Sequence, residues 1–326
     1  MTSPMATPRA RRLGLYGPFI ALAIAVAAWS VGWFWLKDTV ERRLDAAAAR
    51  GRSGGSGLAW TGRSVHGYPF RLDVDFVGAS WREPSGWAVR APILRCETFV
   101  FAPDHWVAVA PAGVGLTRPS GGAVNISAKV LRASLSAVNA RPATVSLEGL
   151  GLSFAPASGA SPYFLRSASE LHVHARAGPN DQGAFYVEVD GATPDPAGAL
   201  GRGAAGEPVT LVADAIYSHA SALAGASWAG AVASWARAGG QVEFRRLRLR
   251  AGAAELNAYG AGVTVDTNGR LEGVLDATLA GGTPALAALG LPRTARGVAA
   301  DRVTLGFAAG QTTLGPVAIG PSPKVY

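Results

Sequence analysis

The chain begins with an uninterrupted apolar stretch. No charged residue occurs from Leu13 to Leu36, and at ~1.5 Å per helical residue this run can cross the ~30 Å hydrocarbon core of a bilayer. Its end is rich in tryptophan and phenylalanine, which is typical of a membrane interface. We therefore expect residues 13–36 to be a transmembrane anchor.

A cleavable signal peptide is the alternative, because residues 25–27 read Ala-Val-Ala after a basic start. The apolar run continues past this position, so we favour an uncleaved span. Lys37, Arg42 and Arg43 follow the span closely, and the charges on its two sides are nearly balanced. We favour an N-terminus inside and export of the bulk of the chain, because the short basic head is easier to retain.

The pattern then suggests a helical stalk. Val40, Leu44 and Ala47 recur at helical spacing within residues 37–50, and the Gly/Ser-rich residues 51–57 interrupt the helix. The expected organisation is a cytoplasmic basic head (1–12), the anchor (13–36), a helical stalk with a flexible joint (37–57), and an exported β-rich domain (58–326).

From residue 70 the hydrophobic period changes to two. Apolar Phe70, Leu72, Val74 and Phe76 alternate with charged residues, which predicts a half-buried antiparallel strand. Further short strands are expected at residues 87–89, 94–101, 106–109, 123–135, 144–154, 171–175, 184–189 and 209–217. The predicted fold is mainly β: a long, curved, mostly antiparallel sheet or a sandwich, with one or two short helices.

Other segments refine this picture. Residues 191–207 are expected to be a loop, 218–238 a helix that buries Trp228 and Trp235, and 283–289 a short helix. A change of parity predicts a β-bulge or a strand bend at Arg245 and Arg246. Residues 263–279 predict a hairpin with its turn at 266–269, and strands at 303–307 and 312–319 should turn at Gly310.

Composition excludes several classes of protein. The 326 residues are 49% hydrophobic and 16% charged, with a net charge of +8, so a sizeable core is possible. The basic residues are scattered rather than interleaved with aromatics as in a nucleic-acid site. The densest group, Arg245 to Arg250, is expected to be a solvated strand face, with a surface for anionic lipid or polysaccharide as the alternative. Cys96 is the only cysteine, so neither an intrachain disulfide nor a cysteine-based zinc site is possible.

Candidate chemical motifs are weak. His172 and His174 share a strand face but lack a third ligand, and Asp73 with Asp75 is typical of the polar side of a strand. His66 has no partner fixed by spacing. Residues 201–206 match GxGxxG without a preceding strand, and residues 225–229 fall one residue short of a nucleophile elbow inside a predicted helix. We expect no catalytic, cofactor-binding or metal residues, and no enzyme activity.

What remains is the apolar face of the sheet. It could be the internal core of a sandwich, or it could line an open groove for an extended hydrophobic ligand. The candidate groove residues are Phe70, Leu72, Val74, Phe76, Val242, Phe244, Leu247 and Leu249.

The stretch from Val65 to Arg71 reads "VHGYPFR" and leads into the first alternating strand. With the anchor before it and "GWAVRAPILRCETFVFAPDHWVAVAP" after it, the chain resembles an uncharacterised proteobacterial envelope family known as domain of unknown function 2125. Gly67, Tyr68, Pro69 and Phe70 are its structural motif, expected at a strand entrance where Phe70 starts the inward-facing series. The arrangement is also similar, more distantly, to AsmA-type envelope proteins, whose curved sheets carry an apolar concave face.

This resemblance implies no activity by itself. The expected function is an inner-membrane-anchored, single-pass periplasmic β-protein that binds, shields or helps move a lipid-like ligand, or supports envelope assembly. The alternative is a scaffolding envelope protein with a closed core and a protein partner. Expected partners are membrane lipid or a lipid-like ligand and other envelope proteins, with no cofactor and no nucleic acid.

Overall fold

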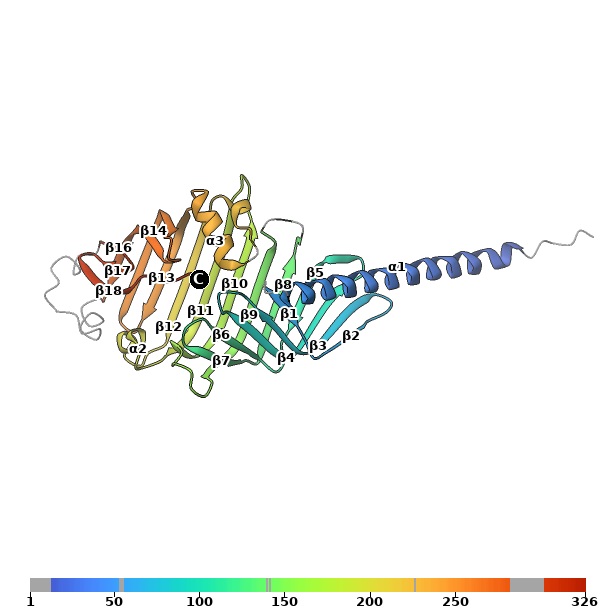
Figure 1. Ribbon diagram of the computed structural model, residues 1–326, viewed down its shortest axis with the longest axis horizontal. Coiled ribbons are helices and arrows are strands. Elements are labelled where there is room, and N and C mark those ends of the chain that lie inside the picture. The colour runs from blue at the N-terminus through green and yellow to red at the C-terminus, as the bar shows by residue number, and fades with distance from the viewer. Residues whose placement is uncertain (1–12, 53–55, 139, 141, 226, 282–301) are drawn as a thin grey trace, which may run out of the picture.

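The computed structural model describes residues 13–52, 56–138, 140, 142–225, 227–281 and 302–326. It consists of one long helix, α1 (Leu13–Arg52), and one antiparallel sheet, with short helices α2 (Ala199–Ala204), η1 (Ala220–Ala222) and α3 (Trp228–Arg237) (Figure 1). The strands are β1 Gly57–Ala59, β2 Gly62–His66, β3 Arg71–Arg82, β4 Ala88–Phe99, β5 Ala102–Val109, β6 Val114–Arg118, β7 Gly122–Ser127, β8 Val130–Ser136, β9 Thr144–Pro156, β10 Leu165–Ala177, β11 Gly183–Pro194, β12 Val209–Tyr217, β13 Val242–Ala251, β14 Ala254–Val265, β15 Leu271–Ala280, β16 Val303–Ala308, β17 Gln311–Leu314 and β18 Val317–Pro321.

Helix α1 has two different halves. Its first part is long and apolar enough to span a membrane, and most of its large side chains are exposed, including Phe19 at 67% and Val31 at 70%. Its second part packs onto the sheet through Val40 and Leu44. The predicted stalk is therefore helical, and it packs against the sheet instead of standing apart from it.

The strands form a single sheet whose neighbouring strands are all antiparallel. The order across the sheet is β2, β3, β4, then two short pairs side by side (β5 with β8, and β6 with β7), then β9 through β18 in sequence. Short strand β1 continues the edge beside β2 by pairing with the end of β3. The predicted curved antiparallel sheet is confirmed, and the sandwich alternative is wrong for the described residues.

Several local predictions are confirmed by the strand register. Arg246 pairs with Asp214 while Phe244 pairs with Ala215, so Arg245 is the extra residue of a β-bulge. The β14–β15 hairpin forms as expected, with its turn closed by a hydrogen bond from the backbone N–H of Asp266 to the oxygen of Arg270.

Other local predictions need correction. The expected strands at 87–89 and 94–101 are one strand, β4. The expected strand at 123–135 is two, β7 and β8, and the expected strand at 312–319 is also two, β17 and β18. The expected loop at 191–207 contains the end of β11 and helix α2, because alanines there pack into an apolar cluster. The expected helix at 218–238 is helical from Trp228, where Ser227 caps α3, and is preceded by the short η1 turn. Trp235 is buried as expected, whereas Trp228 is 43% exposed, so its expected burial is wrong. The helix expected at 283–289 lies outside the described residues.

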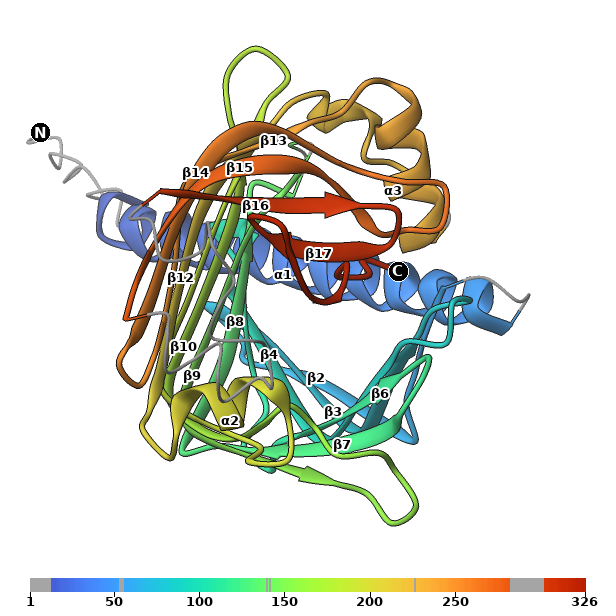
Figure 2. The same ribbon diagram turned by 90° about the vertical axis from the view of Figure 1, so that its left-hand side faces the viewer.

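The sheet is bent into a trough whose apolar face is the inner one. Viewed end-on, Figure 2 shows the strands curving round with α2 and α3 on the inner side. Helix α2 packs near Val209 at the start of β12, and α3 packs near Tyr217 at its end. Residues of equal parity share a strand face, so both helices cover the same face of β12 at opposite ends. At ~3.3 Å per residue these ends are about 26 Å apart.

Candidate functional site

One row of side chains crosses the sheet from the anchor to the far end and contains only apolar residues. Each residue is the cross-strand partner of the next, so the row runs perpendicular to the strands along the trough. This apolar row consists of Val65, Val74, Cys96, Ala108, Ala133, Leu147, Val173, Val187, Ala213, Leu247, Ala258, Ala277 and Val303. At about 4.8 Å per strand, its path is roughly 60 Å long.

A second apolar row widens the surface. From β8 to β15 it contains Leu131, Gly149, Leu171, Val189, Leu211, Leu249, Leu256 and Leu279. The opposite face of the same strands is polar: Arg132 pairs with Glu148, which lies opposite His172, which lies opposite Glu188. The trough therefore has an apolar inner face and a polar outer face.

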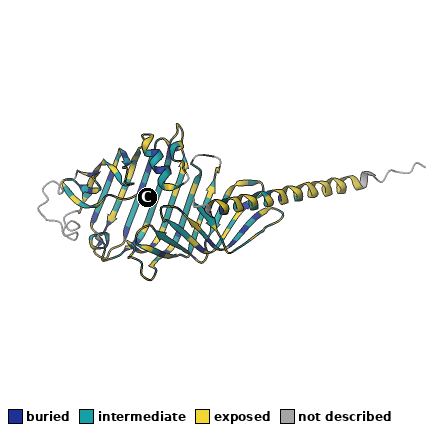
Figure 3. Ribbon diagram, viewed as in Figure 1, coloured by how far each residue is buried: buried dark blue, intermediate teal, exposed yellow. Residues whose placement is uncertain are grey.

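The apolar row is covered at its two ends and open between them. Near the anchor, Val74 is 1% exposed beneath α1, and at the far end Ala277 is 3% exposed within the core. In the middle, Leu147, Val173 and Val187 are only half-buried. Much of the central strands has the colour of intermediate burial in Figure 3.

The exposure of these apolar residues can be compared with that of residues on the polar outer face. Glu148 and His172 face outward from the same strands, with side chains 26% and 28% exposed. The apolar residues behind them fall in the same intermediate range. A side chain in a closed core is shielded from water by the facing layer. Within the described residues, the middle of the inner face therefore has no such layer.

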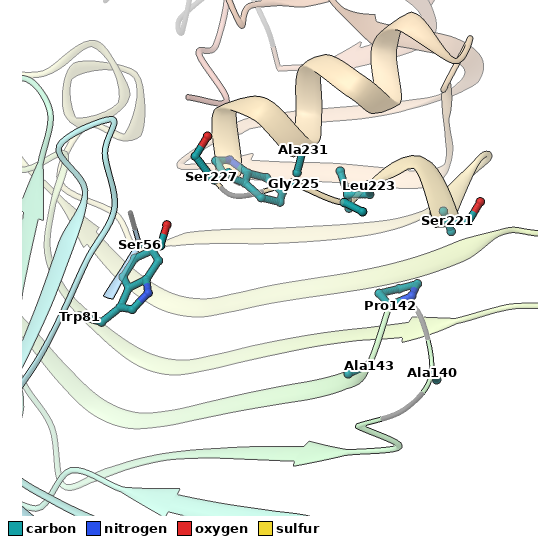
Figure 4. Close-up of a pocket in the computed structure, with 13 residues that line it drawn as sticks. Ser56, Trp81, Ala140, Pro142, Ala143, Ser221, Leu223, Gly225, Ser227 and Ala231 are labelled. Carbon is teal, nitrogen blue, oxygen red and sulfur yellow. The ribbon is translucent and has the colours of Figure 1, made fainter. Parts of the chain in front are cut away.

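Two cavities lie where the trough meets the helices. The first, of about 630 Å³, is lined by Trp228 and Ala231 of α3, by the loop at Leu223 and by Trp81 of β3 (Figure 4). The second, of about 1130 Å³, lies between the end of α1 at Ala48 and strands β1, β3 and β4. Trp81 lines both cavities, so they adjoin each other between α1 and α3.

A buried carboxylate ties the β3–β4 turn to α3. Glu83 is 1% exposed and accepts hydrogen bonds from the backbone N–H of Ser85 at 2.9 Å, from the Ser85 hydroxyl, and from the backbone N–H of Trp228 at 3.1 Å. These donors satisfy a charge that would otherwise be expensive to bury. The link spans 145 positions in the sequence, so no local pattern could have indicated it.

The predicted groove residues do not form one continuous lining. Leu72, Val74 and Phe76 are 0–4% exposed, so they lie in a covered part of the sheet. Val242, Phe244, Leu247 and Leu249 are half-buried on one face of β13, which agrees with their expected common face. Phe70 is 62% exposed and precedes β3, so the expectation that it starts the inward series is wrong. Its backbone belongs to the turn rather than to the strand.

The family-motif residues instead bind the β2–β3 turn to α1. Gly67 has φ +104°, and a Cβ there would lie 2.8 Å from the Arg71 oxygen, so the turn requires glycine. The Tyr68–Pro69 peptide bond is cis. Trp29 Nε1 donates to the Pro69 oxygen and Trp33 Nε1 to the Arg71 oxygen, each at 2.8 Å.

The candidate chemical residues lie on the outer face. His172 and His174 stack with ring centroids 6.5 Å apart; His172 contacts Glu170 at 3.4 Å and His174 contacts Ser146 at 2.9 Å. His66 Nε2 lies 3.0 Å from Asp75, a partner that spacing did not reveal because the β2–β3 register creates the contact. Within the described residues, no three His, Cys, Asp or Glu side chains lie together as metal ligands would.

The two motif-like glycine segments have structural roles. Residues 201–206 lie in and after the six-residue helix α2, which packs on the sheet through Ala204. Ser227, from the segment resembling a nucleophile elbow, accepts a hydrogen bond from the Gly230 N–H as the N-cap of α3. We expected Ser227 to lie inside a helix, but it lies at the start of one.

Cys96 lies on the anchor side of the apolar row, is half-buried, and is the cross-strand partner of the buried Val74. Burial among apolar side chains, with a smaller effect from the Asp75 carboxylate, raises the pKa of its thiol from 9.0 to about 11. The thiol is therefore protonated at neutral pH and behaves as a small apolar group.

These features define a class of protein in which an apolar helix suited to a membrane is joined to a long antiparallel sheet, bent into a trough with an apolar inner face. The family model of uncharacterized proteins conserved in bacteria, domain of unknown function 2125, matches residues 33–323. The chain belongs to this family, as the motif residues indicated. No curated protein and no solved structure matches the chain significantly. The relation to AsmA-type proteins stays a prediction.

Proposed function

We propose that this protein is a membrane-anchored component of the bacterial envelope that binds a lipid-like ligand along its apolar row. The observation that carries the proposal is the open middle of that row, between ends that are covered. An apolar surface of this extent is unfavourable in water unless it meets an apolar partner.

The dimensions suit an acyl chain. From Ala133 on β8 to Val187 on β11 the half-buried part of the row measures about 14 Å at ~4.8 Å per strand. A bilayer core of ~30 Å gives each leaflet about 15 Å of chain length. An extended acyl chain could therefore lie along the row while its polar end stays outside the trough.

The position of the anchor supports the same role. Helix α1 packs over one end of the row through Val40 and Leu44, so the covered end of the trough faces the membrane. We place α1 in the inner membrane with a short basic head inside and the trough in the periplasm. This role makes and breaks no covalent bond, and a non-enzymatic function stays our prediction.

Photo-crosslinking in cells tests the proposal. A photoreactive amino acid is placed at Val187 on the inner face of the full chain, and at its neighbour Glu188 on the outer face as the matched control. After illumination the purified chain is examined by mass spectrometry for acyl-lipid adducts. We expect a several-fold excess of lipid adducts at Val187 over Glu188.

The other outcomes are equally informative. Protein-sized adducts at Val187, without lipid adducts, would favour a scaffold whose partner covers the trough. Equal lipid labelling on the two faces, or no adduct on either, would contradict a ligand site on the inner face.

A further inference from the structure

Four exposed aromatic side chains gather on two adjacent hairpin turns beside α1. They are Tyr68 and Phe70 on the β2–β3 turn, 49% and 62% exposed, and Phe99 at the end of β4 and Phe101 on the turn that follows it, 50% and 70% exposed. The turns are joined by a hydrogen bond from the Val100 N–H to the Phe70 oxygen at 3.0 Å. The Phe99 and Phe101 rings stack with centroids 5.1 Å apart. We name these four residues the aromatic tip.

The aromatic tip is continuous with the exposed apolar surface of α1. The Phe70 ring lies 6.4 Å from the Trp29 ring, and the Tyr68 ring lies 6.2 Å from the Phe34 ring. The Tyr68 hydroxyl is 2.8 Å from the Ser30 hydroxyl. Figure 1 shows the β2–β3 hairpin reaching along α1 toward its N-terminal end. A bilayer that receives the helix therefore meets the tip as well.

Charged side chains follow directly after the aromatic tip, and they indicate where the protein leaves the bilayer and meets water. Arg71, next to Phe70, pairs with Asp73 and Glu97 on the outer face. The Arg71 backbone lies beside Trp33, whose Nε1 donates to its oxygen. From Leu13 to Trp33 the helix measures about 30 Å, the thickness of the hydrocarbon core.

The depth of the tip follows from the same helix. Trp29, which contacts Pro69 and Phe70, lies about one turn, or ~6 Å, deeper than Trp33. Aromatic side chains at this depth occupy the bilayer interface, where their rings are favoured.

We propose that the aromatic tip inserts into the surface of the bilayer that holds α1 and fixes the trough at the membrane. The sheet is already packed on α1, so the helix and the two turns together make a two-point attachment that fixes the tilt of the trough to the bilayer. This attachment rests on α1 as a membrane span and is independent of any ligand in the trough.

Depth-dependent quenching in vesicles tests the attachment. In the full chain carrying Cys96→Ala, a polarity-sensitive fluorophore is attached to Phe101→Cys and the protein is reconstituted into phosphatidylethanolamine and phosphatidylglycerol vesicles. We expect lipids with a nitroxide near the headgroup to quench most of this fluorescence. Phe164→Cys is the matched control, since Phe164 is also an exposed phenylalanine at 58% but lies on the β9–β10 connection.

One further label, at Phe19→Cys, separates the possible failures. Phe19→Cys lies within the apolar run and should be quenched by nitroxides deep in the acyl chain. If Phe19→Cys is quenched while Phe101→Cys responds no more than Phe164→Cys, the tip proposal is wrong and the anchor stands. If Phe19→Cys is not quenched, both the anchor and the tip proposal are wrong.

A charge substitution provides the second measurement. Phe70→Asp, added to the Phe101-labelled chain, should reduce the shallow quenching by placing a carboxylate in the interface. Val77→Asp is the control, because Val77 is 57% exposed on the same strand pair but away from the turn. Equal quenching in both variants would overturn the proposal.

Discussion

Two stretches of the same apolar row contrast in how they are covered. On β14 to β16 the residues Ala258, Ala277 and Val303 are 3–8% exposed, whereas on β9 to β11 Leu147, Val173 and Val187 are half-buried. Both stretches come from strands with the same alternation of apolar and polar residues.

The difference lies in what faces the row. At the far end, Leu305 and Leu314 from the last strands pack with Val263 and Leu275 into a core. In the middle, α2 and α3 cover only the two ends of the strands. Alternation thus orients the apolar side chains, and the elements packed over them decide whether they form a core or a surface.

The largest expected effect comes from shortening one residue of the core that packs with the far end of the row and one residue in its middle. Leu275 is 0% exposed, so Leu275→Ala should lower the free energy of unfolding by about 2–5 kcal/mol. Val187→Ala should lower it by about 1 kcal/mol or less, because a half-buried side chain loses less on truncation. Denaturant unfolding of the full chain in detergent micelles, followed by circular dichroism, measures both. Equal losses would mean that the middle of the row is as closed as its far end.

A smaller effect is expected at the link between the β3–β4 turn and α3. Glu83→Ala removes the acceptor of the Trp228 and Ser85 N–H groups and should cost about 1–3 kcal/mol of stability. Amide hydrogen exchange should rise in α3 and stay unchanged in β14 to β16. Glu207→Ala, at an exposed carboxylate, is the control and should change stability by about 0.5 kcal/mol or less. Unchanged exchange in α3 would show that Glu83 does not hold this edge of the trough.

The smallest effect on stability is expected from ionisation of the Cys96 thiol, on the anchor side of the row. Because burial raises the pKa of the thiol to about 11, the native chain disfavours the thiolate. The stability from this group is present below pH 9.0 and is lost as the pH rises toward about 11. At pH 8 alkylation of Cys96 should be far slower in the native than in the unfolded chain.

The same reaction compares the two parts of the row. A chain with Cys96→Ala and Val187→Cys places a thiol in the open middle, where alkylation should be fast. Mass spectrometry measures the alkylation rates of Cys96 and of the thiol at Val187→Cys. Equal rates would contradict the expectation that the anchor side of the row is better covered than its middle.

The sequence predicted the parts of this molecule that depend on local periodicity. The apolar run, the alternation on β3 and the bulge at Arg245 follow from side-chain spacing within one element. The helix at α2 was missed because alanine and glycine have no strong pattern, and tertiary packing of Ala204 decides it. Phe70 was misplaced because its alternation continues from the strand into a turn that packs on α1.

The candidate site needed information that no single strand contains. The apolar row depends on the register between strands, and a shift of one residue would move every side chain of a strand to the other face. The contact of His66 with Asp75 and the link from Glu83 to Trp228 depend on the same long-range pairing.

The sequence alone determined that this protein has an apolar helix suited to a membrane and a mainly antiparallel sheet with one apolar face. It also carried the motif that identifies the family. Only the tertiary structure decided which part of that face is covered and which residues join into one row. The physical reason is that periodicity is a property of each strand, whereas register and cover arise from contacts between residues far apart in the chain.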